Sequence, residues 1–148
     1  MVNDLKIYGS FAGSETNLNE RDLSLIANKT YLSGDLNGDD QTSGILTAIA
    51  DNVNHVVLSV GNVGTALLDG FTIVGGNANV ATTITVNNQT IQQNNGAGIY
   101  LKNSSPKITN CIISAHTATA NDGGSRIYND NESPIIYNTL ISVNTATG

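Results

Sequence analysis

The residues best suited to chemistry are four oxygen-bearing side chains in the loop 33–42, which reads SGDLNGDDQT. Asp35, Asn37 and Asp39 stand at alternate positions, and Asp40 follows directly. Calcium binds several carboxylate and amide oxygens at once, and the spacing D-x-N-x-D opens an EF-type loop. The loop is therefore a candidate calcium site. Because Asp40 replaces the usual glycine and the closing glutamate is missing, a solvated turn rich in Asp, Asn and Gly is the alternative.

The remaining charged residues offer little for catalysis. An enzyme that cleaves polysaccharides needs grouped carboxylates for acid/base work, usually with an Arg or Lys beside them. From residue 96 onward the acids and bases recur at no catalytic spacing, and they are Asp122, Asp130, Glu132, Lys102, Lys107 and Arg126. We therefore expect no catalytic residue in this segment and no cofactor other than calcium.

Two histidines and one cysteine have structural interpretations. His55 lies in the apolar run NHVVLSV, and His116 has no second ligand nearby in the sequence, so neither is predicted to bind a metal. Cys111 is the one cysteine of the chain and cannot form an internal disulfide. Its surroundings, ITNCII, favour a small and partly buried residue over a nucleophile.

The elements that carry these residues follow from an internal repeat of 28 residues. Residues 96–120 read GAGIYLKNSSPKITNCIISAHTATA, and residues 124–148 read GSRIYNDNESPIIYNTLISVNTATG. Without gaps, 13 of the 25 positions are identical. A third, weaker copy lies at 68–79. Residues 80–95 are then an insertion, which we expect to project outward as a hairpin or a coil.

The composition of each copy predicts the fold. Three short β-prone runs alternate with Asn, Ser, Pro and Gly, and no helical period interrupts them. Stacking such copies at about 4.8 Å buries one apolar set along a common axis. The sequence therefore predicts an all-β, right-handed parallel β-helix. This single-stranded solenoid would have three short strands in each coil of 28 residues.

The domain organisation follows from the same repeat. Residues 1–148 are expected to form one β-helix segment, a fragment of a longer helix. Irregular coils with the acidic loop occupy 1–66, and regular coils with the insertion occupy 67–148.

The register of the repeat predicts which residues stack on one another. The apolar pairs are Ile99 with Ile127, Ile108 with Ile136, and Ile112 with Leu140. Asn110 and Asn138 should form a hydrogen-bonded ladder at a tight turn, a structural role that we favour over ligand binding. Tyr100 and Tyr128 would stack as an aromatic pair. An exposed pair of this kind offers a candidate carbohydrate face, and simple packing between coils is the alternative.

Charge and composition exclude some partners. Charged residues make up 12% of the chain, against about 25% in an ordinary domain. A net charge of -6 with only six basic residues disfavours nucleic acid. No stretch approaches the ~20 apolar residues of a membrane span. The N-terminal residues MVNDLKIYGSF lack the features of a secretory signal, as expected for a cytosolic protein or for a segment of a longer precursor.

In these motifs the chain resembles secreted bacterial right-handed parallel β-helix proteins, akin to those with chlamydial polymorphic outer-membrane-protein repeats. The resemblance rests on IYGSFAGSET (7–16), LSGDLNGDD (32–40), LLDGFTIVGGNAN (67–79) and the two copies with the pattern G-x-x-I-Y…S-P…N…I-S. It covers most of the chain.

The resemblance implies an extracellular or outer-membrane, cell-surface location. It also implies a non-catalytic scaffold, like an adhesin or an autotransporter passenger, that presents a repetitive surface to a carbohydrate or a host-cell protein and continues into further coils. The alternative is a part of a carbohydrate-active enzyme, a polysaccharide lyase or hydrolase, whose active site lies outside this segment.

Overall fold

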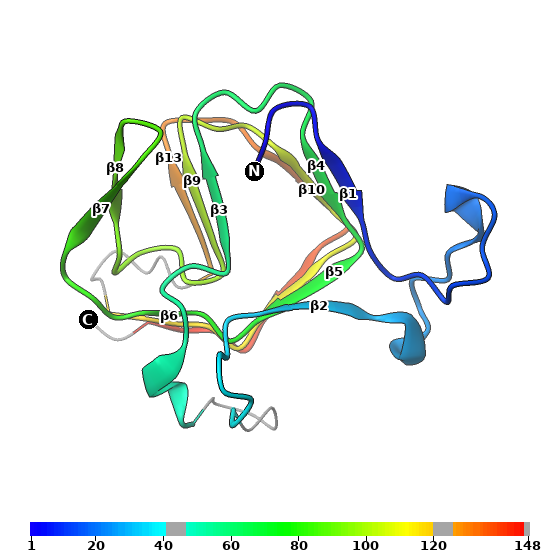
Figure 1. The fold of residues 1–148 in the computed structure, drawn as a ribbon, viewed down its shortest axis with the longest axis horizontal. Coiled ribbons are helices and arrows are strands. Elements are labelled where there is room, and N and C mark those ends of the chain that lie inside the picture. The colour runs from blue at the N-terminus through cyan, green and yellow to red at the C-terminus, as the bar shows by residue number, and fades with distance from the viewer. Residues whose placement is uncertain (41–46, 120–125, 147–148) are drawn as a thin grey trace.

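The computed structural model describes residues 1–40, 47–119 and 126–146, and within them the chain is an all-β protein. Its strands form four parallel sheets and one antiparallel hairpin (Figure 1). Three short 3-10 helices lie in the connections: η1 (Leu18–Glu20), η2 (Ile26–Asn28) and η3 (Ile49–Asp51). Across the described ranges, no helix has the length and hydropathy that a membrane crossing needs.

The strands recur in layers along the chain. Layer 1 consists of β1 (Lys6–Tyr8) and β2 (Thr30–Ser33). Layer 2 consists of β3 (Val57–Val60), β4 (Leu67–Asp69), β5 (Phe71–Val74) and β6 (Asn77–Ala78). Layer 3 consists of β9 (Ile99–Lys102), β10 (Lys107–Thr109), β11 (Ile112–Ser114) and β12 (Thr117–Ala118). Layer 4 consists of β13 (Ile127–Asp130), β14 (Ile135–Tyr137), β15 (Leu140–Ser142) and β16 (Thr145–Ala146).

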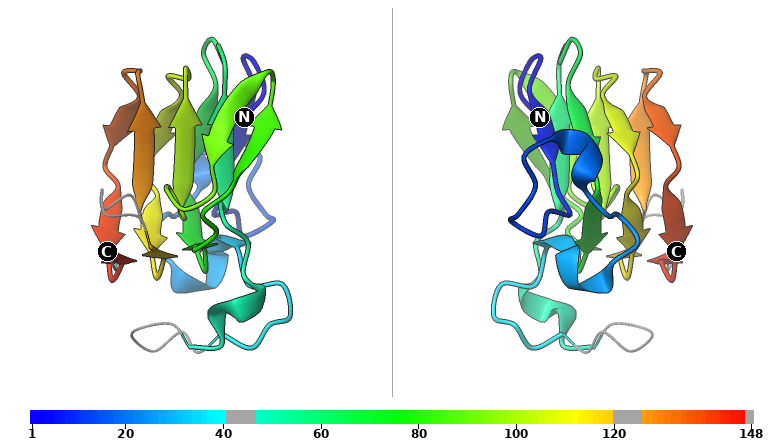
Figure 2. Two further views of the ribbon diagram at one scale, coloured as in Figure 1. Left: turned by 90° about the vertical axis from the view of Figure 1, so that its left-hand side faces the viewer. Right: turned by 90° about the vertical axis from the view of Figure 1, so that its right-hand side faces the viewer.

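Each sheet collects the equivalent strand of successive layers. Sheet A has the order β1-β4-β10-β14, sheet B has β2-β5-β11-β15, sheet C has β3-β9-β13 and sheet D has β6-β12-β16. Figure 1 looks along the stacking direction, so the strands of one sheet overlap. Figure 2 shows the layers side by side, from the blue N-terminal layer to the red C-terminal layer. The four sheets therefore run along the stack. Layers 2 to 4 each contribute one strand to every sheet, and layer 1 contributes one strand to sheet A and one to sheet B.

The observed pairing has the register that the repeat predicts. All neighbouring strands in sheets A to D are parallel, and Ile99 lies opposite Ile127. In the same way Ile108 pairs with Ile136 and Ile112 with Leu140. Equivalent side chains therefore stand next to one another, about 4.8 Å apart.

Alternate side chains point into the stack and form its core. The main apolar cluster contains Val57, Leu68, Phe71, Ile73, Ile99, Leu101, Ile108, Cys111 and Ile113. Ile108 and Ile113 in layer 3 are fully buried, whereas their layer 4 counterparts Ile136 and Ile141 are 41% and 39% exposed. Burial thus depends on having a layer on both sides.

The organisation differs in two details from the sequence-based expectation. Layers 2 to 4 each have a fourth strand of two residues, β6, β12 and β16, in addition to the three predicted. Regular stacking also begins at β3, before the expected boundary at residue 67, because Val57 pairs with Ile99 across the insertion. Residues 41 and 42 of the acidic loop, 120–125 with Asp122, and 147–148 lie outside the described residues.

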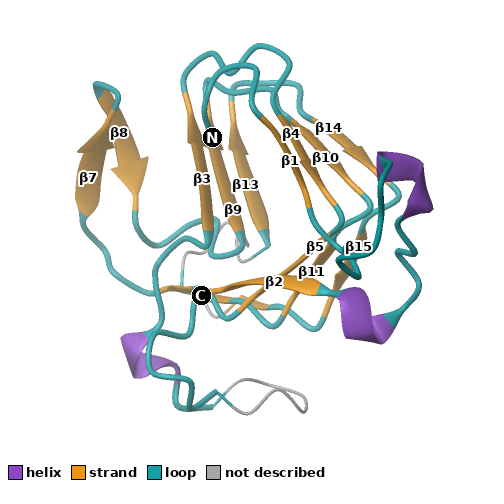
Figure 3. Ribbon diagram, turned by 45° about the vertical axis from the view of Figure 1, so that its right-hand side comes forward, coloured by secondary structure: helices purple, strands orange, loops and turns teal. Residues whose placement is uncertain are grey.

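The insertion at 80–95 is a hairpin of β7 (Thr83–Val86) and β8 (Gln89–Gln92). Asn87 and Asn88 connect the strands with φ values of 47° and 58°, as a tight hairpin turn requires. Ile91 on β8 is fully buried and packs with Val60 and Tyr100. The hairpin therefore covers the outer face of sheet C (Figures 1 and 3).

Asp69 on β4 joins the N-terminal segment to the stack. Its carboxylate lies 2.6 Å from the Arg21 guanidinium and accepts hydrogen bonds from Thr109 and from the Asn110 side chain. Burial alone would raise the pKa of Asp69, but the bonds from Thr109, Arg21 and Asn110 hold it below its usual value. Asn138 donates to Asn110 Oδ1 at 2.7 Å, so the predicted asparagine pair extends to Asp69 across three layers.

A second polar ladder lies inside the stack at His116. The neutral ring accepts a hydrogen bond from the Gly76 amide at Nδ1 and donates from Nε2 to the Ile73 carbonyl, at 2.9 and 3.0 Å. Asn144 repeats this pattern one layer later, because its side chain accepts from the His116 amide and donates to the Ile113 carbonyl. Histidine and asparagine can occupy equivalent positions of the repeat because each side chain has a donor and an acceptor group.

The buried ring predicts an acid-sensitive fold. Burial lowers the pKa of His116 to about 4, against about 6.5 in the unfolded chain. Above pH 6.5 the neutral ring contributes fully to the free energy of unfolding. This contribution is lost as the pH falls toward 4, because the unfolded chain takes up a proton at a higher pH than the folded chain does. We expect the titration of this residue to lower the free energy of unfolding by about 3 kcal/mol between pH 7 and pH 4.

The matched variant is His116→Asn, which keeps a donor and an acceptor but does not titrate. Denaturant unfolding at both pH values should show a smaller loss for the variant than for the natural chain. Equal losses would show that the carboxylates alone cause the acid sensitivity.

Candidate functional site

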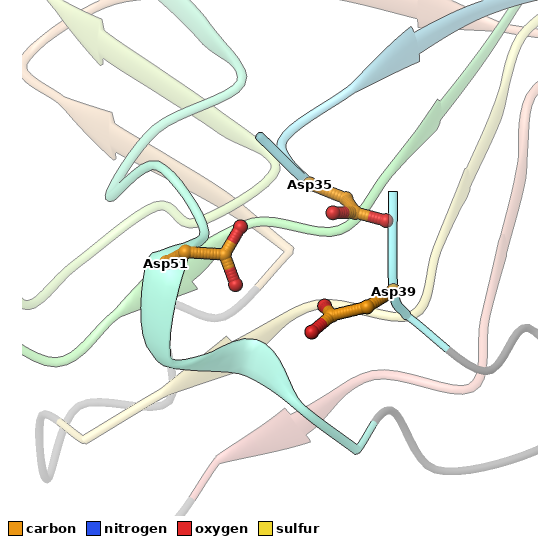
Figure 4. A group of neighbouring side chains, drawn as sticks. All are labelled: Asp35, Asp39 and Asp51. Atoms are coloured by element: carbon orange, nitrogen blue, oxygen red, sulfur yellow. The ribbon is translucent and has the colours of Figure 1, made fainter. Parts of the chain in front are cut away.

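The acidic loop after β2 brings three carboxylates together. Asp35, Asp39 and Asp51 each offer an oxygen atom, and these atoms lie within 4.8 Å of one another (Figure 4). Asp35 and Asp39 follow β2 in the chain, whereas Asp51 ends η3. This spacing allows one hard cation to contact all three residues.

Backbone amides already occupy part of this cluster. Asp35 Oδ1 accepts hydrogen bonds from Gly38 N at 2.7 Å and Asn37 N at 3.2 Å, and its Oδ2 accepts from Asp40 N at 3.1 Å. Asp51 Oδ2 accepts from Asn37 N at 3.1 Å. The carboxylates therefore shape the turn by themselves, which is the alternative to a metal-binding role.

The carboxylates perturb one another electrostatically. Burial alone would raise the pKa of Asp35, but its bonds from the loop amides hold it below the usual range. Burial, together with the charges of Asp35, Asp39 and Asp51, raises the pKa of Asp40, although the Asn52 side chain donates to it at 2.8 Å. A bound divalent cation would relieve this repulsion.

The sequence-predicted ligand set is rearranged in the structure. Asp35 and Asp39 belong to the cluster, but Asp40 turns to Asn52 and the Asn37 side chain accepts from Asp39 N at 3.1 Å. Asp51 takes part instead, and the sequence reasoning missed it. Its separation from the D-x-N-x-D motif left no spacing signal that could have found it.

Tyr100 is buried, whereas the candidate carbohydrate face requires an exposed pair of tyrosines. Its ring is 1% exposed and lies 5.0 Å from the ring of Tyr128, while its hydroxyl accepts from Gln92 N at 3.3 Å. The hairpin covers it, so the pair packs between layers. Tyr128 is partly buried beside it.

The two histidines and the cysteine have structural surroundings. The His55 ring lies 5.1 Å from the Tyr100 ring, and its Nδ1 is 3.2 Å from the Gly96 carbonyl oxygen. Burial raises the pKa of the Cys111 thiol, which disfavours a nucleophilic thiolate. Within the described part of the chain, neither these residues nor His116 belong to a group of metal-ligating side chains.

The acids of layer 4 are engaged in contacts with layer 3. Asp130 forms an ion pair with Lys102, and Glu132 accepts a hydrogen bond from the Ser105 hydroxyl at 2.8 Å. Lys102 and Asp130 occupy equivalent positions of the repeat, whereas Ser105 and Glu132 are offset from equivalence by one residue. These contacts join layer 3 to layer 4.

No protein-family model, curated protein or solved structure matches this chain.

The carboxylate cluster predicts a calcium-dependent melting temperature. If calcium binds the folded loop, a concentration of 100 times its Kd stabilises the protein by about 2.7 kcal/mol, and a chelator reverses the effect. Asp51→Asn should abolish the shift, because it removes one charged ligand while its side-chain oxygen can still accept the loop amides. Thermal unfolding followed by circular dichroism measures both effects.

The control is Asp22→Asn, which removes the same charge from an exposed loop away from the cluster. It should leave the calcium response unchanged. If calcium does not alter the melting temperature of the natural chain, the cluster is a turn and not a metal site.

Proposed function

We propose that the chain is a segment of a right-handed parallel β-helix that serves as a non-catalytic scaffold. By its motifs we place it among secreted or cell-surface bacterial proteins, with a role like that of an adhesin or an autotransporter passenger. The observation that carries the proposal is the in-register stacking of equivalent strands in all four parallel sheets.

A β-helix accounts for the parallel pairing with the fewest assumptions. The chain visits sheets C, A, B and D in the same order in layers 2, 3 and 4. Connections between parallel strands of one sheet are right-handed in nearly all proteins, which supports the proposed hand.

The placement of the charged residues supports a scaffold without catalysis. Asp69, Asp130 and Glu132 are engaged in contacts within and between layers. The alternative is a carbohydrate-active enzyme whose active site lies on other coils. Grouped Asp, Glu and Arg residues on one face of adjoining coils would favour that alternative.

Further layers of the same repeat are proposed partners. The inward-pointing residues of layer 4 are partly exposed, including Ile136 at 41% and Ile141 at 39%. Their layer 3 counterparts, Ile108 and Ile113, are fully buried under layer 4. Another coil with the same register would cover these apolar side chains in the same way.

The proposed stacking makes a matched pair of core mutations informative. Ile108→Ala should cost about 3 kcal/mol of unfolding free energy, because the side chain is fully buried between layers. Ile136→Ala, at the equivalent position of layer 4, should cost about 1 kcal/mol because its side chain is 41% exposed. Urea unfolding measures both values, and equal losses would contradict the layered core.

A scaffold should bind without turning over its ligand. Purified chain incubated with neutral and acidic polysaccharides is expected to release no reducing ends and no unsaturated products. Cleavage above the buffer level would contradict the proposal if it disappears in Asp35→Asn or Asp40→Asn, because that loss excludes a contaminating enzyme.

A further inference from the structure

We propose that the outer face of sheet B holds a binding groove for a linear, uncharged oligosaccharide, with Tyr31 as the stacking platform. The inference rests on the proposed scaffold function, since it names the site and the ligand class that such a scaffold would use.

The groove is a cleft of about 580 Å³ that crosses β2, β5 and β11. This volume is within the range of small-molecule sites, about 300–1,000 Å³. Tyr31 lies opposite Thr72, and Thr72 lies opposite Ile112, so these three outward side chains form a row across the strands. The row runs along the stacking direction, which suits an elongated ligand.

Tyr31 is the feature that points to a sugar. Its side chain is 55% exposed, whereas Thr72 beside it is only 7% exposed. An aromatic ring that stands free over a closed floor offers its negative face to the C–H groups of a sugar ring. Tyr100, in contrast, is covered by the hairpin.

The polar rim of the groove supplies matching hydrogen-bonding groups. Ser33 and Ser114 contribute hydroxyls, Asp35 and Asp40 contribute carboxylates and Lys29 contributes an ammonium group. Sugar hydroxyls both donate and accept, so they can pair with each of these groups. An apolar floor with a few convergent polar groups is the usual composition of a small-molecule site.

Charge favours an uncharged ligand over an acidic one. Asp35 and Asp40 line the groove, and Asp39 and Asp51 lie in the same loop cluster as Asp35. Lys29 is the one cationic residue of the lining. A uronate or a phosphate would therefore meet like charge at this end, which costs affinity.

The geometry also favours a saccharide over an extended peptide. A peptide that adds to a sheet pairs with the free backbone of an edge strand. This groove lies on the face of sheet B, where the backbone groups of β5 are already paired with β2 and β11. Recognition here must use side chains, and those present are an aromatic ring, hydroxyls and carboxylates.

The test is a titration of the ¹⁵N-labelled chain with neutral β-1,4-linked hexasaccharides of glucose and of N-acetylglucosamine, with chelator present to exclude calcium bridging. Hexagalacturonate serves as the acidic probe. For at least one neutral probe, we expect amide shifts confined to β2, β5, β11 and the adjoining residues of the groove, including Asp35 and Asp40. Tyr31→Ala should weaken that binding about tenfold, and Tyr31→Phe should retain it.

The matched control is Tyr137→Ala, because Tyr137 is 71% exposed and lies outside the groove. It should leave the affinity unchanged. Asp40→Asn should raise the affinity for hexagalacturonate severalfold by removing like charge. Binding that Tyr31→Ala does not weaken, shifts at other strands, or tighter binding of the acidic probe to the natural chain would each overturn the proposal.

The same titration separates this inference from the proposed function. New anomeric signals from cleaved sugar, together with shifts in the groove, would keep the groove and contradict the scaffold. No shift with any neutral probe, in a chain that is folded and does not cleave, would overturn the groove and leave the scaffold standing.

Discussion

Hydrogen bonding between equivalent strands of successive layers governs the rest of this structure. The parallel, in-register pairing of sheets A to D fixes the neighbours of every residue by its position in the repeat. Alternate side chains must then point inward, and an inward polar group needs a hydrogen-bond partner in a neighbouring layer. His116 and Asn144 meet this requirement by bonding the backbone of the layer before them.

The same constraint determines where irregular sequence can go. Extra residues cannot enter a strand without breaking register, so they leave the stack between strands. The segment between β1 and β2, the acidic loop after β2 and the β7–β8 hairpin are all excursions of this kind. The acidic loop holds two of the three clustered carboxylates and lines one end of the groove on sheet B.

The sequence predicted layers 3 and 4 well because their copies share 13 of 25 positions, which fixes the register directly. It did not predict layer 1, because Lys6 pairs with Leu67 across two long excursions. Tyr31 escaped notice for the same reason, since only strand pairing places it beside Thr72. The position of Asp51 beside Asp35 and the burial of Tyr100 also depend on how the excursions fold back onto the stack. The periodicity of the sequence does not encode this folding.

The inner ladder has a direction. His116 reaches back to Gly76 and Ile73, and Asn144 reaches back to His116 and Ile113. In layers 3 and 4, the inward polar side chain thus bonds to backbone groups that precede it in the chain. A nascent chain leaving the ribosome N-terminus first would find the partners of every new layer already in place, so this fold can be built in the order of synthesis.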